Sequence, residues 1–70
     1  MADNTIQIPV ADEEATDILH RRLMQRFQEE KGRVLTKQES DGCWWTICGI
    51  VMRQGHEAGR QYVDTVALRD

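Results

Sequence analysis

Hydrophobic positions recur at helical spacing between Glu13 and Lys31. At 100° per residue, the apolar side chains of this segment fall on one stripe and most charged ones lie on the opposite side. Asp12 precedes the segment as a candidate N-cap, and Gly32 follows it where a left-handed C-cap glycine belongs. The pattern therefore predicts an amphipathic helix over residues 13–31. Its core-facing residues are Thr16, Leu19, Leu23 and Phe27, with Ala15, His20 and Met24 beside them.

On both sides of this helix the pattern alternates with a period of two, which is typical of β-strands. Residues 5–10 alternate in this way, and Pro9 places the short strand at a sheet edge or a strand end. Asp41-Gly42 is the two-residue signal of a type I′ hairpin, which predicts that residues 33–38 pair with residues 43–53.

A last strand is expected over residues 60–68, after a loop that Gly55 and Gly59 bracket. The predicted fold class is α+β, with one amphipathic helix packed on a three- to four-stranded, mainly antiparallel sheet in the order βαβββ. Seventy residues leave room for a single domain, residues 1–70, with residues 1–4 as a disordered N-terminal tail.

The predicted strand over residues 43–53 is apolar on both faces of the sheet. On the face beneath the helix, the hairpin register places Val34, Trp45, Ile47 and Val51. On the second face, it places Trp44, Cys48, Ile50 and Met52. Either the sheet twist or the N-terminal arm buries the second face within the chain, or a protein partner or a second copy of the chain covers it. We predict the latter, because burying a Trp or an Ile stabilises a marginal domain by about 1.5–3 kcal/mol.

A second candidate contact lies on the solvent side of the predicted helix. Ile18 breaks the apolar stripe, and Arg22 and Arg26 lie one turn apart on the flank beside it. Two like charges at this spacing disfavour a helix, so they call for a counter-charge. Glu29 and Glu30 can supply one within the helix. Alternatively, Ile18, Arg22 and Arg26 bind an acidic surface on a partner protein.

Composition narrows the classes of function. Lys and Arg number 9 against 12 Asp and Glu, a net charge of -3 that disfavours nonspecific contact with a phosphate backbone. No apolar run reaches the ~18 residues that cross a bilayer, and the N-terminus lacks the features of a signal peptide. We therefore expect a cytoplasmic protein that contacts no membrane and keeps its two cysteines reduced.

A metal site is not expected, although two cysteines and two histidines include the ligand types of zinc. On a regular strand, Cys43 and Cys48 would point to opposite faces about 16 Å apart, too far for one ion or a disulfide. The spacing from Cys48 to His56 also departs from that of zinc-binding modules. We therefore expect both cysteines to be small buried hydrophobes.

Catalytic signatures are lacking as well. The chain has no nucleophile elbow, metalloprotease motif or phosphate-binding loop, so we expect neither an enzyme nor a cofactor. The stretch from Gly55 to Gly59, between Arg53 and Arg60, could cradle an anion, but G-x-x-x-G is a weak pattern. A flexible connection between strands explains these glycines better.

These patterns favour a non-enzymatic protein-interaction module that self-associates as a homodimer through the apolar sheet face. Small acidic domains without a catalytic site are typical of inhibitors or adaptors encoded by phages and other mobile elements. The alternative is a single-stranded nucleic-acid-binding domain, in which Arg33 and Lys37 flank Trp44 on a basic stacking platform. The net acidic charge and the neighbouring Glu39 count against nucleic acid.

Overall fold

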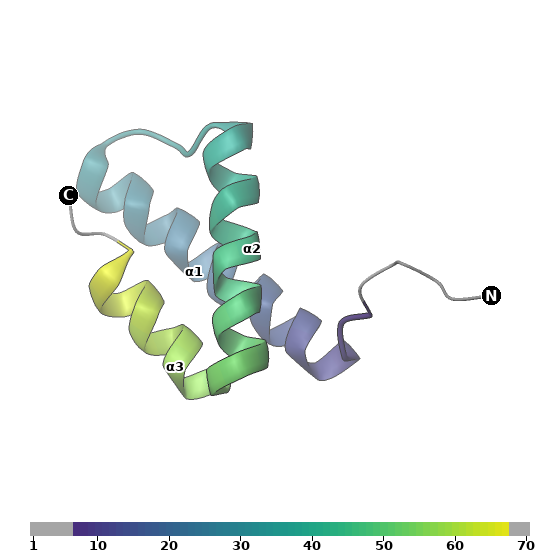
Figure 1. The fold of residues 1–70 in the computed structure, drawn as a ribbon. Helices are drawn as coiled ribbons and strands as arrows, with labels where there is room; N and C mark the ends of the chain where they lie inside the picture. Colours follow the sequence, from purple (N-terminus) through teal and green to yellow (C-terminus); the bar gives the residue numbers. More distant parts are fainter. Residues whose placement is uncertain (1–6, 68–70) are drawn as a thin grey trace.

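The computed structural model describes residues 7–67, which fold into helices joined by short connections (Figure 1). α1 spans Val10–Lys31, α2 spans Lys37–Gln54 and α3 spans His56–Gln61. α3 continues directly into η1, a π-helical turn over Tyr62–Val66. Residues 7–67 contain no strand, so the predicted α+β fold is wrong and this part of the chain is all-helical. No helix among these residues is long and apolar enough to cross a membrane.

α1 is the helix that the hydrophobic pattern predicts. It begins at Val10 rather than at residue 13, because Pro9 is its N-cap and Asp12 lies inside the first turn. Gly32 ends it with the expected left-handed conformation, at a φ of 72°. The strand expected over residues 5–10 is absent from residues 7–10. Residues 1–6, which include the expected tail, lie outside the described part of the chain.

The stripe that the pattern assigns to the core is confirmed. Thr16, Leu19 and Leu23 are buried, and Phe27 is half-buried. The buried hydroxyl of Thr16 is satisfied, because it donates to the carbonyl oxygen of Asp12 over 2.7 Å. α1 therefore packs with the face that helical periodicity selects.

α2 takes the place of the predicted hairpin, and a capping box fixes its start. The Glu39 N–H donates to Oγ1 of Thr36 over 3.2 Å, and the Thr36 N–H donates to Oε1 of Glu39 over 3.0 Å. The Arg33 guanidinium donates two further hydrogen bonds to this carboxylate, at 3.0 and 3.2 Å. Asp41 and Gly42 therefore lie in the second turn of α2 and form no type I′ turn.

The two strands of that hairpin are replaced accordingly. Residues 33–36 connect α1 to α2, and residues 43–53 form most of α2. When residues 43–53 are read as a strand, apolar side chains fall on both of its faces, because those that form the core follow helical spacing instead. Cys43, Ile47 and Val51 recur every four residues and all contribute to the core.

Glu39→Gln is expected to remove a pH-dependent part of the stability. Hydrogen bonds from Arg33, and then from the Thr36 backbone, lower the pKa of Glu39 to about 2 from an ordinary 4.5. A carboxylate with a lowered pKa stabilises the fold above its unfolded-state pKa, and the contribution is lost as the pH falls through its folded-state pKa. Melting curves should therefore place wild type above the variant at neutral pH, with the gap closing between about pH 4.5 and about pH 2.

The matched control is Glu29→Gln. Glu29 is exposed on α1 and makes no ion pair among residues 7–67. Its replacement should leave the melting curves close to those of the wild type across the same pH range. A gap between wild type and Glu39→Gln that stays constant down to pH 2 would contradict the assigned role of Glu39.

A single residue, Gly55, connects α2 to α3. Its φ of 99° and ψ of 170° lie in a region open essentially only to glycine, so the chain turns back within one residue. α3 and η1 occupy the segment predicted as the last strand, which is therefore wrong for residues 60–67. Leu68, at the end of that predicted strand, lies outside the described residues.

The core lies where the helices meet. In Figure 1 α2 crosses in front of α1, and α3 rises beside them from the lower end of α2. Each of α1, α2 and η1 contributes to one buried cluster: Leu19, Leu23, Ile47, Val51 and Val63. Val34 and Trp45, which the hairpin register placed in the core, are exposed instead.

Candidate interaction surface

One side of α2 points away from the core and alternates between small and large residues. Gly42, Trp45, Gly49 and Met52 follow one another at intervals of three, four and three residues, so they line up along the helix. Ile47 of the same helix faces the opposite way, into the core. In Figure 1 α2 lies nearer the viewer than α1, and no helix lies in front of it. We call these four residues the α2 outer face.

Trp45 is the largest exposed side chain of the α2 outer face. It is 58% exposed and packs edge-on against Trp44, with ring centroids 5.0 Å apart and planes at 84°. Trp44 is itself fixed, because its Nε1 donates to Oδ1 of Asp17 on α1 over 2.8 Å. α1 therefore braces the tryptophan pair, and this bracing holds the Trp45 ring out towards solvent.

Met52 extends the apolar surface towards the C-terminal end of α2. Its side chain is 41% exposed, and its Sδ lies 3.6 Å from Sγ of Cys48, which is buried beneath it. Methionine is unbranched and polarizable, so it fits partner surfaces of different shapes. Together, Trp45 and Met52 make an exposed apolar strip with a glycine beside each large side chain.

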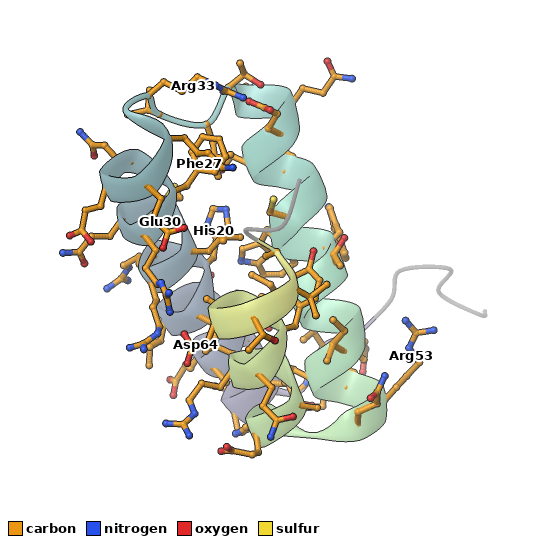
Figure 2. All side chains as sticks on the ribbon, turned by 90° about the vertical axis from the view of Figure 1, so that its left-hand side faces the viewer. His20, Phe27, Glu30, Arg33, Arg53 and Asp64 are labelled. Carbon is orange, nitrogen blue, oxygen red and sulfur yellow. The ribbon has the colours of Figure 1, made fainter. Side chains whose placement is uncertain are left out.

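The two ends of the α2 outer face carry opposite charges. Asp41 precedes Gly42 at one end, and Arg53 follows Met52 at the other. Neither forms an ion pair with another described residue. Arg53 instead lies along Gly49, with its Nε donating to the Gly49 carbonyl oxygen over 3.1 Å. Figure 2 shows the Arg53 side chain directed away from the other helices.

The residues predicted to share the second sheet face are separated by the helix. Trp44, Cys48 and Met52 follow at intervals of four and stay on one flank of α2, where only Met52 is strongly exposed. Ile50 lies on another side, where it is half-buried and lines a cavity of about 270 Å³ with residues of α3 and η1. The predicted second sheet face is therefore wrong. A strand repeats every two residues and a helix every 3.6, so the two elements place the same side chains on different sides.

The arginine pair on α1 finds its counter-charge on η1. Oδ1 of Asp64 accepts from Arg22 Nε over 2.8 Å and from Arg26 Nη1 over 2.9 Å, and Arg26 also lies 3.7 Å from Glu30. The hydrogen bond from Arg22, with further help from Arg26, lowers the pKa of Asp64. Figure 2 shows Asp64 on the side of η1 that faces α1. The predicted contact patch thus has both arginines engaged within the chain, while Ile18 is 64% exposed.

A histidine and a serine also meet across α1 and α2. Nε2 of His20 lies 3.0 Å from both the carbonyl oxygen and Oγ of Ser40, and Figure 2 shows His20 between the two helices. A serine beside an imidazole is one part of a nucleophilic site. Nε2 donates to the Ser40 oxygens in one tautomer and accepts from the Ser40 hydroxyl in the other, and in both the ring links α1 to α2. This geometry favours a polar clamp between α1 and α2.

Two of the side chains predicted for a nucleic-acid platform, Arg33 and Trp44, are engaged by other residues of the chain. Arg33 binds Glu39 and lies over the ring of Phe27, 4.8 Å from its centroid. Trp44 is held against α1 by its hydrogen bond to Asp17. The Arg33 guanidinium and the Trp44 ring therefore contact different neighbours within the chain.

The surroundings of the two cysteines bear on metal binding and on thiol reactivity. Among residues 7–67, no three His, Cys, Asp or Glu side chains lie close enough to hold a metal ion. Cys43 and Cys48 are both free thiols. Burial, and then the charge of Glu39, raises the pKa of the Cys43 thiol, which disfavours the reactive thiolate form.

Comparisons of the chain with models of protein families, with curated proteins and with solved structures give no match. The function has therefore to be inferred from the surface itself. The strand prediction for residues 43–53 placed Trp45 in the core, so Trp45 and the two glycines of the α2 outer face were not among the predicted contact residues. Their intervals of three, four and three residues are the signal in the sequence that could have identified them.

Proposed function

We propose that the protein is a non-enzymatic interaction module that binds other protein surfaces through the α2 outer face. The observation that carries the proposal is the exposed strip of Trp45 and Met52 on a helix whose opposite side forms the core. A domain of this size has little apolar surface to spare, and an exposed apolar strip on a soluble domain is typical of a binding site.

The chemistry of the strip supports protein recognition in particular. Tryptophan is among the residues that contribute most to protein interfaces, and methionine is also enriched there. Trp44 and Asp17 hold Trp45 in place before any partner arrives, so little conformational entropy is lost on binding. The charged residues Asp41 and Arg53 lie at the ends of the strip, as in a polar rim around an apolar centre.

The test is capture of binding proteins, including the chain itself, by immobilised wild type and by Trp45→Glu. Loss of an interface tryptophan commonly costs at least about 2 kcal/mol, so capture should fall by about 30-fold or more. Ile18→Glu is the matched control, because it places the same charge at a similarly exposed site on α1.

Circular dichroism should show that both variants fold, since both replaced side chains are exposed. Capture that survives Trp45→Glu would contradict the proposal. Capture lost with Ile18→Glu but not with Trp45→Glu would move the contact to α1 and would also contradict it.

A further inference from the structure

We propose that the α2 outer face binds the same face of a second copy of this chain, with the two α2 helices antiparallel about a two-fold axis. This inference rests on the proposed function, because it names the partner for the same surface. A two-fold interface requires a surface that is complementary to itself. The α2 outer face meets this requirement in shape and in charge.

The complementarity in shape follows from the spacing of the four residues. An antiparallel register that sets Trp45 opposite Gly49 of the partner subunit also sets Met52 opposite Gly42 of the partner subunit. Each large side chain then meets a residue without a side chain, and the symmetry repeats both contacts. A parallel pairing of equivalent residues would set Trp45 against its own copy and leave the glycines facing each other across a gap.

The space above Gly42 is open to such a contact, and at Gly49 the exposed guanidinium of Arg53 is the group that an indole would meet. A Cβ built on Gly49 would touch only the guanidinium of Arg53, with Nη2 at 3.2 Å, and one on Gly42 would touch nothing within 4 Å. An indole ring lying on Gly49 would therefore also meet the Arg53 guanidinium, a favourable cation–π pair. Arg53 already points away from the other helices of its own subunit (Figure 2).

The charges select the antiparallel orientation. At the N-terminal end of α2, Arg33 neutralises Glu39 and Lys37 adds a positive charge, so Asp41 is the acidic group without an ion pair among the described residues. Arg53 is the basic residue of the last turn. Antiparallel helices bring the Arg53 end of one subunit towards the Asp41 end of the other, whereas parallel helices bring each of these charges beside its own copy. Opposed helix dipoles favour the same orientation.

Association is expected to be weak, because two helices of 18 residues make a small interface. Sedimentation equilibrium of the full chain should show a monomer–dimer transition between about 1 and about 500 micromolar. Trp45→Glu should weaken the dimer by at least about 30-fold. Gly49→Leu fills the space for the indole and should weaken it by at least about 10-fold, while Trp45 stays exposed. Ile18→Glu should dimerise like the wild type.

The register has its own readout. In a dimer mixed from isotope-labelled and unlabelled chains, filtered NOEs should link the Trp45 ring to the Cα protons of Gly49 of the partner subunit. Both variants should keep the helical circular dichroism of the wild type, because Trp45 is exposed and only the exposed side chain of Arg53 lies near Gly49.

The outcomes separate the inference from the proposed function. A wild-type chain that stays monomeric at about 500 micromolar overturns the inference, as does a Gly49→Leu variant that dimerises undiminished. A dimer without NOEs between Trp45 and Gly49 overturns it as well. If the monomeric chain nevertheless captures a different protein and Trp45→Glu abolishes that capture, the proposed function stands and only the second copy is excluded.

Discussion

Ile47→Ala is expected to unfold most of the protein at room temperature. Ile47 is fully buried at the centre of the cluster that joins the helices. Truncation of a buried isoleucine removes its apolar contacts and leaves a cavity, which together cost about 2–5 kcal/mol. A single core in a chain of this length supplies only about 3–5 kcal/mol of stability, so the loss is comparable to the total.

Urea unfolding followed by circular dichroism measures this loss. Ile18→Ala is the matched control, because Ile18 lies mid-helix on α1 and is mostly exposed. Its truncation should change the free energy of unfolding by less than about 0.5 kcal/mol. Equal losses in the two variants would contradict the core described above.

Gly59→Ala is expected to give the second-largest loss, although alanine is the better helix former. A Cβ at this position would lie 2.7 Å from Cγ2 of Val51 and 3.0 Å from Cδ1 of Leu19. Both neighbours are buried core side chains that cannot move aside freely. Overpacking costs about 1–3 kcal/mol and exceeds the gain of about 1 kcal/mol in helix propensity, so α3 should loosen from α1 and α2.

Gly42→Ala makes the same replacement where nothing lies within 4 Å of the new Cβ. Because Gly42 lies inside α2, alanine should raise the free energy of unfolding by about 0.5–1 kcal/mol. Both glycine variants are best compared in a Trp45→Glu background, so that self-association does not enter the measurement. A stabilising Gly59→Ala would show that α3 does not approach α1 and α2 as closely as described.

Helical periodicity predicted α1 well because its signals agree with one another. Its apolar stripe, its acidic first turn and Gly32 at its end all indicate one helix, and the structure confirms the buried stripe. The predicted N-cap was wrong by one turn, since Pro9 rather than Asp12 precedes the helix. Helix ends are set by local hydrogen bonds, which apolar spacing does not report.

The rest of the fold was missed because a short turn signal outweighed a capping signal. Asp41-Gly42 is typical of a hairpin, but Thr36 and Glu39 six and three residues before Gly42 form a capping box, which marks a helix start. With the helix started at residue 37, Cys43, Ile47 and Val51 fall on the core side, and Trp45 and Met52 fall on the outer side. β-branched residues and tryptophans favour strands only weakly, and packing against α1 overrides that preference.

The proposed interaction surface overlaps in part with the residues predicted from the sequence. An exposed apolar strip in this segment was expected from the excess of apolar residues, and Met52, one of the predicted residues, is exposed. Trp45 was excluded because the strand register placed it beneath the helix, although it is the most exposed tryptophan of the chain. The excess of apolar residues was enough to predict that this segment has an exposed apolar strip. Which residues form the strip depends on whether the segment is a strand, with a period of two residues, or a helix, with a period of 3.6.

The single-residue connection at Gly55 also bears on how the chain folds. α2 and α3 are neighbours in sequence as well as in space, and the connection between α1 and α2 is short too. Most contacts therefore close small loops, which costs little entropy and favours rapid folding. The core side and the outer side of α2 belong to one helix. Both sides therefore form in the same folding step, when α2 packs against the other helices. Under the proposed function, a binding partner would then meet a folded surface rather than a chain that must still fold.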